Sequence, residues 1–337
     1  MTECLRDAGS VWGSVVWPGA WQAAIVGLLA WGLSGWLGRW SPSAGLVAAA
    51  AGLIKFVMPG VVQSPVAFVD AAARQAPTPL AGSGPLMAAV AALHVGGALL
   101  GVAALVIRSR RLRRLGDEAS PAPRAWQATC EALAEELAWP SRRGLPALRV
   151  SRATASPMAF GVLRPVILLP EGLTTADART AIAHELAHHR HHDLRVEWGL
   201  ALLTACWWWH PVAWLLARRV RGLREQRADG AVVDAGIASA GEYCEALVRI
   251  ARGSTTPTLA AGVGHPLARR VRRLLERPAP SRRRRVLLLA AAWAFLLTGA
   301  PHAARWTPLP GRAASHAADQ SIVVQRLVSV VTTRHVR

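Results

Sequence analysis

The sequence predicts an α-helical membrane protein, with about four transmembrane helices and a cytoplasmic domain that combines helices and strands. Of its 337 residues, 52% are hydrophobic and only 18% are charged, which excludes a disordered chain, a coiled coil and an acidic tail protein. The apolar residues are concentrated in runs long enough to cross a bilayer, which takes about 20 residues. The net charge of +19 comes almost entirely from arginine, since Lys55 is the only lysine. Most of these arginines flank the apolar runs.

Four segments have the length and composition of spanning helices. They are residues 19–38, 43–62, 84–107 and 286–300. The first lacks the basic start and the cleavage site of a secretory signal peptide, so we do not expect it to be removed. Lys55 and His94 lie inside these segments, where an ionisable group is a functional candidate. Snorkelling of the lysine, and packing of a neutral histidine against a neighbouring helix, are the simpler explanations.

The positions of the arginines predict the orientation of the chain, because positively charged loops stay on the cytoplasmic side. Residues 108–114 contain five arginines, and a second cluster directly precedes the fourth apolar segment. We therefore expect residues 108–285 to form a cytoplasmic domain. Residues 1–107 then form a membrane region with its amino terminus outside, and the tail 301–337 is extracytoplasmic. This distribution explains the positive net charge of the chain, so no nucleic-acid partner is needed to explain it. Nucleic acid is the weakest of the partners considered.

The predicted cytoplasmic domain begins with a mixture of elements. Residues 116–124 contain Pro and Ser and predict a linker. Residues 125–138 have the spacing of an amphipathic helix that ends before Pro140. Residues 147–152 and 165–169 are short runs typical of strands, each bounded by Pro, Gly or Ser.

A helix predicted to begin after Thr174 and to end near His192 contains the motif HELAH, residues 184–188. Residues four apart lie on one face of a helix, so His184 and His188 can both present a ring nitrogen to one metal ion. Glu185 is placed to act as general base on a metal-activated water. The further histidines of HELAHHRHH leave an alternative open, a histidine-rich polar helix end with adventitious metal binding.

A catalytic zinc site needs a third protein ligand and an open fourth position. The four cysteines are far apart and form no CxxC pair, so they predict neither a disulfide framework nor a cysteine-bound zinc. Glu225 in LREQRAD is the candidate ligand, and Asp229 lies on the same helix face, where it can orient a ligand histidine. An exposed charged helix face is the alternative. Asp193 can also orient a ligand histidine, or it caps a helix end.

The apolar segment between these motifs, residues 196–217, is long enough to be a further span. If it crossed the bilayer once, His188 and Glu225 would lie about 30 Å apart and could not share an ion at about 2 Å. Because Pro211 interrupts the segment, we expect a helical hairpin that dips into the membrane or packs against it. His210 lies at the turn, where it can approach the site as an oxyanion donor or serve in capping or packing.

Four motifs in this order resemble the membrane metallopeptidases of the BlaR/MecR type, peptidase family M fifty-six. They are SPMAFGVLRPVILLP, HELAHHRHHD, WWWHPVAWLLARR and LREQRADGAVV, and the resemblance covers about residues 20–235. It implies a gluzincin-like α+β protease domain in a multi-pass protein of the cell membrane. It also implies one zinc ion bound by His184, His188 and Glu225, with Glu185 as the catalytic base. In the best-known members, activation leads to loss of a cytoplasmic helix-turn-helix repressor.

One departure from that family concerns sensing. The β-lactam sensors carry a large penicillin-binding domain after the last span. Only residues 302–337 follow it here, and they contain no SxxK nucleophile motif. We therefore do not expect this chain to sense β-lactams covalently.

The sequence thus predicts a membrane-embedded zinc metalloendopeptidase that cleaves a cytoplasmic protein, hypothetically a transcriptional repressor, and also itself. Phe160 and Gly161 begin a segment, 160–163, whose strand edge can accept an extended substrate peptide. Membrane lipid and a second copy of the chain are the other expected partners. Two alternatives remain open. The first is a zinc-stabilised receptor without turnover, although a purely structural zinc site would not need a base such as Glu185. The second is a quality-control protease of the HtpX type.

Overall fold

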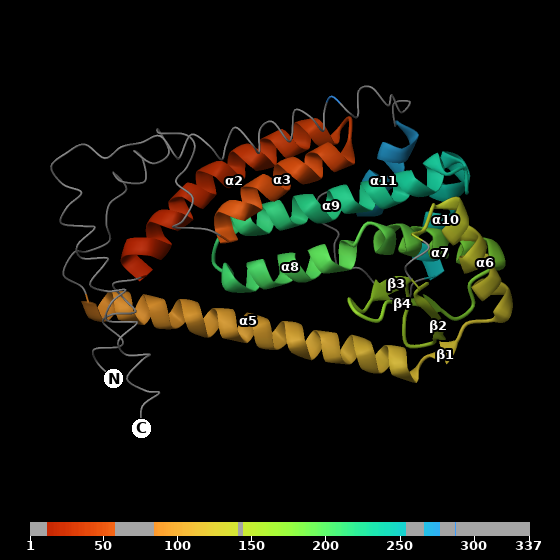
Figure 1. Cartoon of the computed structure of the whole chain (residues 1–337), viewed down its shortest axis with the longest axis horizontal. Coiled ribbons are helices and arrows are strands. Elements are labelled where there is room, and N and C mark those ends of the chain that lie inside the picture. The colour runs from red at the N-terminus through yellow and green to blue at the C-terminus, as the bar shows by residue number, and fades with distance from the viewer. Residues whose placement is uncertain (1–11, 58–83, 141–143, 254–265, 277–286, 288–337) are drawn as a thin grey trace.

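The computed structural model describes residues 12–57, 84–140, 144–253, 266–276 and 287. The fourth predicted span (except Leu287) and the predicted tail lie outside these residues, as do residues 58–62 of the second span. The described part is mostly helical. Long helices extend along the longest axis of the molecule, and a small sheet with shorter helices lies at one end (Figure 1).

The first apolar helices form an antiparallel pair. A π-helical turn, η1 (Trp12–Val16), leads into α2 (Trp17–Gly38), and α3 (Pro42–Val57) returns alongside it. The pair packs closely because glycines face each other: a Cβ atom on Gly45 would lie 3.0 Å from the Cα of Gly38. Such small-residue contacts are typical of helices that associate within membranes.

Within the described residues, two helices are long and apolar enough to cross a membrane, at residues 19–38 and 85–118. The second belongs to α5 (Gly84–Glu118), whose apolar part exposes Leu99 and Leu100 by 65% and 73%. The first and third predicted segments are therefore confirmed as apolar helices of spanning length. The second is represented by the shorter α3, and the total of four spans stays a prediction. Because α5 continues through the arginines to Glu118, the linker prediction was wrong at its start.

The predicted helical hairpin is present, and it lies between these apolar helices. It consists of α8 (Asp193–Cys206) and α9 (Pro211–Asp234), with Pro211 at the first position of the second helix, where its missing N–H costs nothing. In Figure 1 the hairpin lies between α5 on one side and the α2/α3 pair on the other. Glycines again allow the helices to approach closely. A Cβ atom on Gly27 of α2 would lie 2.6 Å from Val212 of α9, and one on Gly101 of α5 would lie 2.9 Å from Ala205 of α8.

Replacement of Gly101 by Leu is expected to destabilise the packing of α8 against α5. The nearest atoms to a new Cβ include the Cα of Ala205 at 3.1 Å, so a backbone must move, and overpacking of this kind costs about 1–3 kcal/mol. Thermal unfolding of the protein in detergent measures the effect. Gly96→Leu, next to the same helix stretch but with open space around its Cβ direction, is the matched control. Equal melting temperatures for the two variants would contradict the packing described here.

Hydrogen bonds fix the turn of the hairpin to the apolar helices α3 and α5. The indole N–H of Trp207 donates to the carbonyl of Phe56 in α3 at 3.0 Å. His94 in α5 accepts the indole N–H of Trp12 at Nδ1, so its Nε2 carries the proton and donates to the carbonyl of Cys206, both at 2.8 Å. Both nitrogens of His94 are thereby used by structural contacts, which supports the packing explanation over a functional one.

The sheet at the other end of the molecule has the strand order β1-β2-β4-β3. The two predicted runs form its centre as a parallel pair, β2 (Ala147–Ser151) and β4 (Val166–Pro170). The edges are β1 (Ser120–Pro121) and β3 (Met158–Phe160), both antiparallel to their neighbours. β1 escaped prediction because two residues are too few to show alternation. The strand edge predicted at 160–163 overlaps β3 only at Phe160, since the strand ends there.

Helices pack on this sheet to form a hydrophobic core that is separate from the contacts between the apolar helices. α6 (Arg124–Glu136) and α7 (Thr175–Arg190) agree with the predicted helices, and the Thr174 side chain caps α7 by accepting the N–H of Asp177 at 3.1 Å. α10 (Ala240–Gly253) and α11 (Pro266–Leu275) complete the domain. The core joins α6, the sheet, α7 and α10 through fully buried side chains, among them Leu133, Ile167, Ile182, Leu186 and Tyr243.

Candidate metal centre

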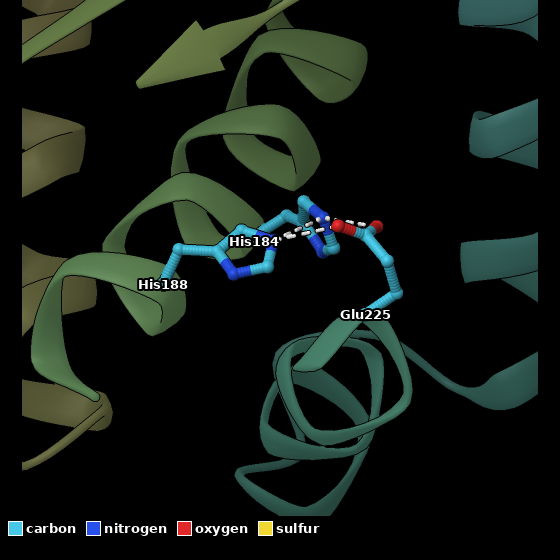
Figure 2. A group of neighbouring side chains, drawn as sticks. All are labelled: His184, His188 and Glu225. Carbon is cyan, nitrogen blue, oxygen red and sulfur yellow. Dashed lines mark hydrogen bonds and ion pairs between the residues drawn. The ribbon is translucent and has the colours of Figure 1, made fainter. Parts of the chain in front are cut away.

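Three side chains predicted to share an ion converge between α7 and α9 (Figure 2). The Nε2 atoms of His184 and His188 lie 3.1 Å apart. The two carboxylate oxygens of Glu225 lie 3.5 Å and 3.4 Å from these nitrogens. Four ligands at about 2.05 Å in a tetrahedron are separated from one another by about 3.3 Å. The three groups therefore have the spacing of a zinc ligand set.

The hydrogen bonds of the two imidazoles determine which nitrogen faces the centre. Nδ1 of His188 bonds to the Asp193 carboxylate at 2.7 Å, and a carboxylate can only accept, so this nitrogen carries the proton. The hydroxyl of Tyr243 donates to Asp229 at 2.9 Å and accepts from Nδ1 of His184 at 2.8 Å. Both Nε2 atoms consequently face the centre, where each can offer its lone pair to an ion.

Two Nε2 atoms and a carboxylate converge here, so the arrangement favours a positively charged species between them, either a proton or a metal ion. The electrostatics agree. Burial disfavours a charge on His188, but Asp193 and Glu225 outweigh it and raise its pKa to about 10. Burial would raise the pKa of Glu225, but the two histidines lower it well below its usual range. A proton can bridge two of these groups, whereas a divalent ion can meet all three, so the donor set fits zinc.

Glu185 and an adjacent cavity complete the chemical environment. The cavity has a volume of about 1060 Å³, and Glu185 lines it together with the three converging residues. Its other walls are mainly apolar side chains of α10 and α11, and residues 156, 157 and 159 at the start of β3. A peptide could thus lie next to both Glu185 and the cation site.

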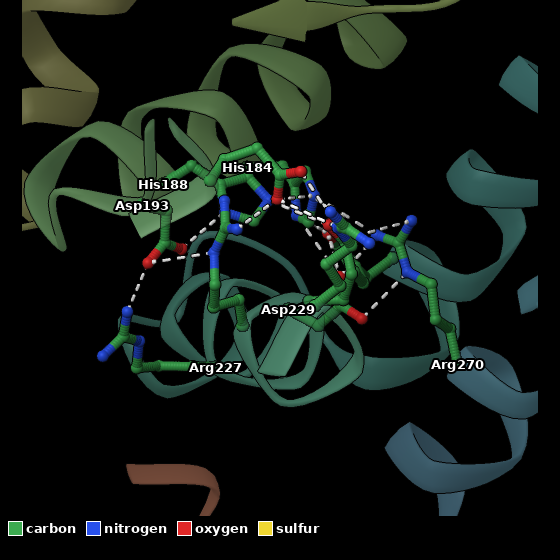
Figure 3. A network of polar contacts seen from close by, with 11 residues as sticks. His184, His188, Asp193, Arg227, Asp229 and Arg270 are labelled. Carbon is green, nitrogen blue, oxygen red and sulfur yellow. Dashed lines mark hydrogen bonds and ion pairs between the residues drawn. The ribbon is translucent and has the colours of Figure 1, made fainter. Parts of the chain in front are cut away.

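Two carboxylates orient the histidines, as the sequence allowed. Asp193, which is fully buried, contacts His188 and also forms ion pairs with Arg224 and Arg227 (Figure 3). Asp229 lies 3.3 Å from Nδ1 of His184 through the same oxygen that Tyr243 contacts. Among the described residues, the neighbouring His189, His191 and His192 do not join the converging group.

The structure does not bring His210 to this centre. It precedes α9 and its Nε2 contacts the carbonyl of Ala20 at 3.2 Å, while its ring packs on Phe56. Fifteen residues of helix, about 22 Å, separate it from Glu225. The oxyanion interpretation was therefore wrong, and the packing alternative holds.

Phe160 and Gly161 also lie away from the cavity lining. The ring of Phe160 packs against Gly116 of α5, where a Cβ atom would lie 2.5 Å from the ring. Gly161 has φ +85° and closely approaches the carbonyl of Arg164, a position that suits only glycine. Direct contact with substrate is thus not supported for these two residues. The cavity is instead lined by Ala159, the preceding residue of the same edge strand β3.

Tyr243 and Arg270 are parts of the site that sequence reasoning missed. Tyr243, the only tyrosine in the chain, comes from α10, and Arg270 comes from α11, where it forms a bidentate pair with Asp229 (Figure 3). The arginine had been attributed to the cluster that marks the cytoplasmic side. No local spacing connects either residue with HELAH, so only the tertiary fold identifies them.

Tyr243→Phe is expected to lower zinc affinity by about 10–100-fold, because residues that orient metal-ligating histidines contribute this much. The ring volume is kept, so the buried core should remain packed. Competition with a chromophoric chelator measures the affinity. Ser239→Ala is the control, since Ser239 caps the start of the same helix through Glu242 without touching His184. Equal zinc affinities of Tyr243→Phe and the wild type would contradict a role for the hydroxyl.

Comparisons with known proteins bear on this centre. Residues 46–275 match the profile of the family described as BlaR1 peptidase M56. A stretch of 81 residues is 33% identical to the regulatory protein BlaR1 of Bacillus licheniformis. This alignment covers 23% of the chain but only 14% of that relative.

Proposed function

Because the family match spans 230 of its 337 residues, the chain belongs to the M56 peptidases, and from this membership we propose that it is a zinc metalloendopeptidase held in the cell membrane. The family consists of metallopeptidases. The observation that carries the proposal is the convergence of His184, His188 and Glu225 next to a large cavity that also contains Glu185.

The chain's own residues account for each role in peptide hydrolysis. His184, His188 and Glu225 would hold one zinc ion, which supplies a polarised scissile carbonyl and a water of lowered pKa when bound. The Glu185 carboxylate takes a proton from the attacking water and passes it to the nitrogen of the leaving amine. Asp193 and the Tyr243–Asp229 pair keep both histidines protonated at Nδ1, so that Nε2 stays available as a ligand.

We place this centre at the cytoplasmic surface of the bilayer. Leu223 in α9 contacts Gly38, the last residue of α2, and Glu225 lies about 3 Å further along the helix. At the other end of the hairpin, Trp208 contacts Gly97 of α5. Ten residues, about 15 Å, separate Gly97 from the arginines after Ile107. The hairpin turn then lies near the middle of a hydrocarbon core about 30 Å thick.

Cys206 at the hairpin turn offers a direct test of this depth. We expect a nitroxide attached to Cys206, in a Cys4→Ser background, to be more accessible to dissolved oxygen than to a polar nickel chelate, as at a bilayer midplane. The other two cysteines in the described part, Cys130 and Cys244, are buried. Arg110→Cys in the polar part of α5 is the control and should show the reverse preference. Preferential access of the nickel chelate to Cys206 would refute the insertion.

The proposed substrate is a cytoplasmic protein, with a transcriptional repressor as the specific hypothesis. The regulatory name of the relative from Bacillus licheniformis favours it over general quality control. β3 is an outer strand of the sheet as described and lies beside the cavity, so its edge can pair with an extended peptide. Proteomic comparison of wild-type cells with cells that carry Glu185→Gln is expected to show one DNA-binding protein that persists in the variant. Persistence of many misfolded membrane proteins instead would favour the HtpX-type alternative.

A further inference from the structure

Arg270 approaches the candidate metal centre from the cavity side, on a helix that precedes the arginine-rich segment. Its Nη1 lies 3.3 Å from a carboxylate oxygen of Glu225, and its Nη2 lies 3.4 Å from Nε2 of His184. The side chain is 22% exposed and lines the same cavity as Glu185. A fixed positive charge thus lies beside the place where a scissile peptide bond must be positioned.

The guanidinium is held by one of the most buried carboxylates of the domain. Asp229, with a side chain 2% exposed, accepts from Nε of Arg270 at 3.0 Å and from Nη2 at 2.6 Å. Asp229 is itself fixed by the hydroxyl of Tyr243. This fork uses Nε and Nη2. Nη1 carries two N–H groups, of which one faces Glu225 at 3.3 Å, so the other remains for a further acceptor.

We propose that Arg270 is a further catalytic residue, which donates a hydrogen bond from Nη1 to the carbonyl oxygen of the scissile peptide bond. The inference rests on the proposed peptidase function. As the oxygen of water bonds to the carbonyl carbon, the π electron pair of the carbonyl moves onto its oxygen, and Arg270 stabilises the negative charge without losing a proton. When the C–N bond breaks, the pair returns to the carbonyl and the amine leaves with the proton delivered by Glu185.

The physical basis is preorganisation. A donor fixed by a buried partner does not have to reorient when charge develops, and loss of one such donor typically lowers kcat by about 10²–10³-fold. Arg272, two residues away on α11, provides the contrast. It is 77% exposed and pairs with Glu276 one turn further along the helix, so it has the same charge without access to the centre.

Two other roles of Arg270 make different predictions. If it only anchors α11 to Asp229, its loss should lower stability and zinc affinity. If it only recognises a carboxylate on the substrate, its loss should weaken the ground-state complex as much as the transition state. An oxyanion donor instead discriminates between a planar peptide and a tetrahedral mimic of the same sequence.

The experiment uses the full-length protein in lipid nanodiscs with zinc. A quenched-fluorescent peptide cleaved by the wild type is selected from a library, and a phosphinic pseudopeptide of the same sequence is made. Its tetrahedral, negatively charged phosphinate replaces the scissile amide. Affinities for the pseudopeptide, and for the uncleaved parent peptide in a Glu185→Gln background, are measured for Arg270→Ala, Arg270→Lys and Arg272→Ala. Zinc content and melting temperature are determined for each variant.

We expect both Arg270 variants to lose about 10²–10³-fold in affinity for the phosphinic pseudopeptide and less than about threefold for the planar peptide, with zinc content unchanged. Arg270→Lys can still pair with Asp229 through one ammonium group, so it covers the case in which Arg270→Ala does not fold. Arg272→Ala should match the wild type. Equal losses for both ligands, loss of zinc in the lysine variant, or full retention of pseudopeptide affinity would each overturn the catalytic role.

The two proposals fail in distinguishable ways. A wild-type protein that binds no zinc and cleaves no library peptide overturns the peptidase function, and with it the role of Arg270. A wild type that cleaves peptide while Arg270→Lys behaves like Arg272→Ala overturns only the role of Arg270.

Discussion

Glu185→Gln is expected to abolish peptide cleavage, including self-cleavage, while the protein keeps its fold and its zinc. Glutamine has nearly the same shape as glutamate, but its amide cannot take a proton from the attacking water. General base catalysis contributes about 10²–10⁴-fold, so the residual rate should fall below detection in an ordinary peptide assay. Zinc should be retained because the three proposed ligands are other residues, His184, His188 and Glu225.

The measurement is hydrolysis of a quenched-fluorescent peptide by purified protein, alongside metal analysis of the same sample. Glu171→Gln makes the same chemical change at an exposed carboxylate that follows β4, pairs with Arg152 and does not line the cavity, and it should retain full activity. Cleavage by Glu185→Gln at the wild-type rate would remove Glu185 from the mechanism. Such a result would leave a contaminating protease or a different base as the source of activity.

The parts of the site that could be predicted from sequence are those fixed by helix periodicity. His184 and His188 are four residues apart on α7, as are Glu225 and Asp229 on α9, and this spacing alone puts each pair on one face. The hairpin followed from one added assumption, that His188 and Glu225 share an ion, since two ligands of one ion cannot lie on opposite sides of a membrane. The two helix-face pairs needed no knowledge of how distant segments pack.

The parts that escaped prediction depend on tertiary contacts. Tyr243 reaches His184 from a helix 59 residues away in sequence, and Arg270 reaches it from 86 residues away. Neither belongs to a motif with a characteristic spacing, and a single arginine within a basic cluster shows no sign of a special role. His210 illustrates the converse error: it is adjacent in sequence to the tryptophans of the hairpin turn, and the long α9 carries it away from the centre.

The hairpin formed by α8 and α9 connects the candidate metal centre with the apolar helices. At one end it supplies Asp193, Glu225 and Asp229 to the candidate centre. At the other, the carbonyl of Cys206 and the indole of Trp207 bond to the apolar helices α5 and α3. Hydrophobic packing against the apolar helices therefore positions polar side chains that would otherwise have to be oriented within a small domain.

Glu225→Ala is expected to lower zinc affinity by more than about 10²-fold, because loss of a ligand should exceed the 10–100-fold effect of losing a residue that merely orients one. Binding of zinc to the folded state alone stabilises that state, by about 2.7 kcal/mol when free zinc is 100 times its dissociation constant. The wild type should therefore melt roughly 5–10 °C higher with zinc than with a chelator, and the variant should show almost no difference.

The matched control for this variant is Gln226→Ala, the next position on α9, which does not belong to the converging group. It should retain the zinc-dependent rise in melting temperature, whereas Glu225→Asp should retain part of it, since a shorter carboxylate keeps the charge but misplaces the oxygens. A zinc-dependent rise of wild-type size in Glu225→Ala would mean that the stabilising ion binds elsewhere. Because the Nε2 atoms of His184 and His188 already lie 3.1 Å apart, removal of the carboxylate leaves only two ligand atoms at the centre, and two neutral ligands alone should not hold a divalent ion tightly.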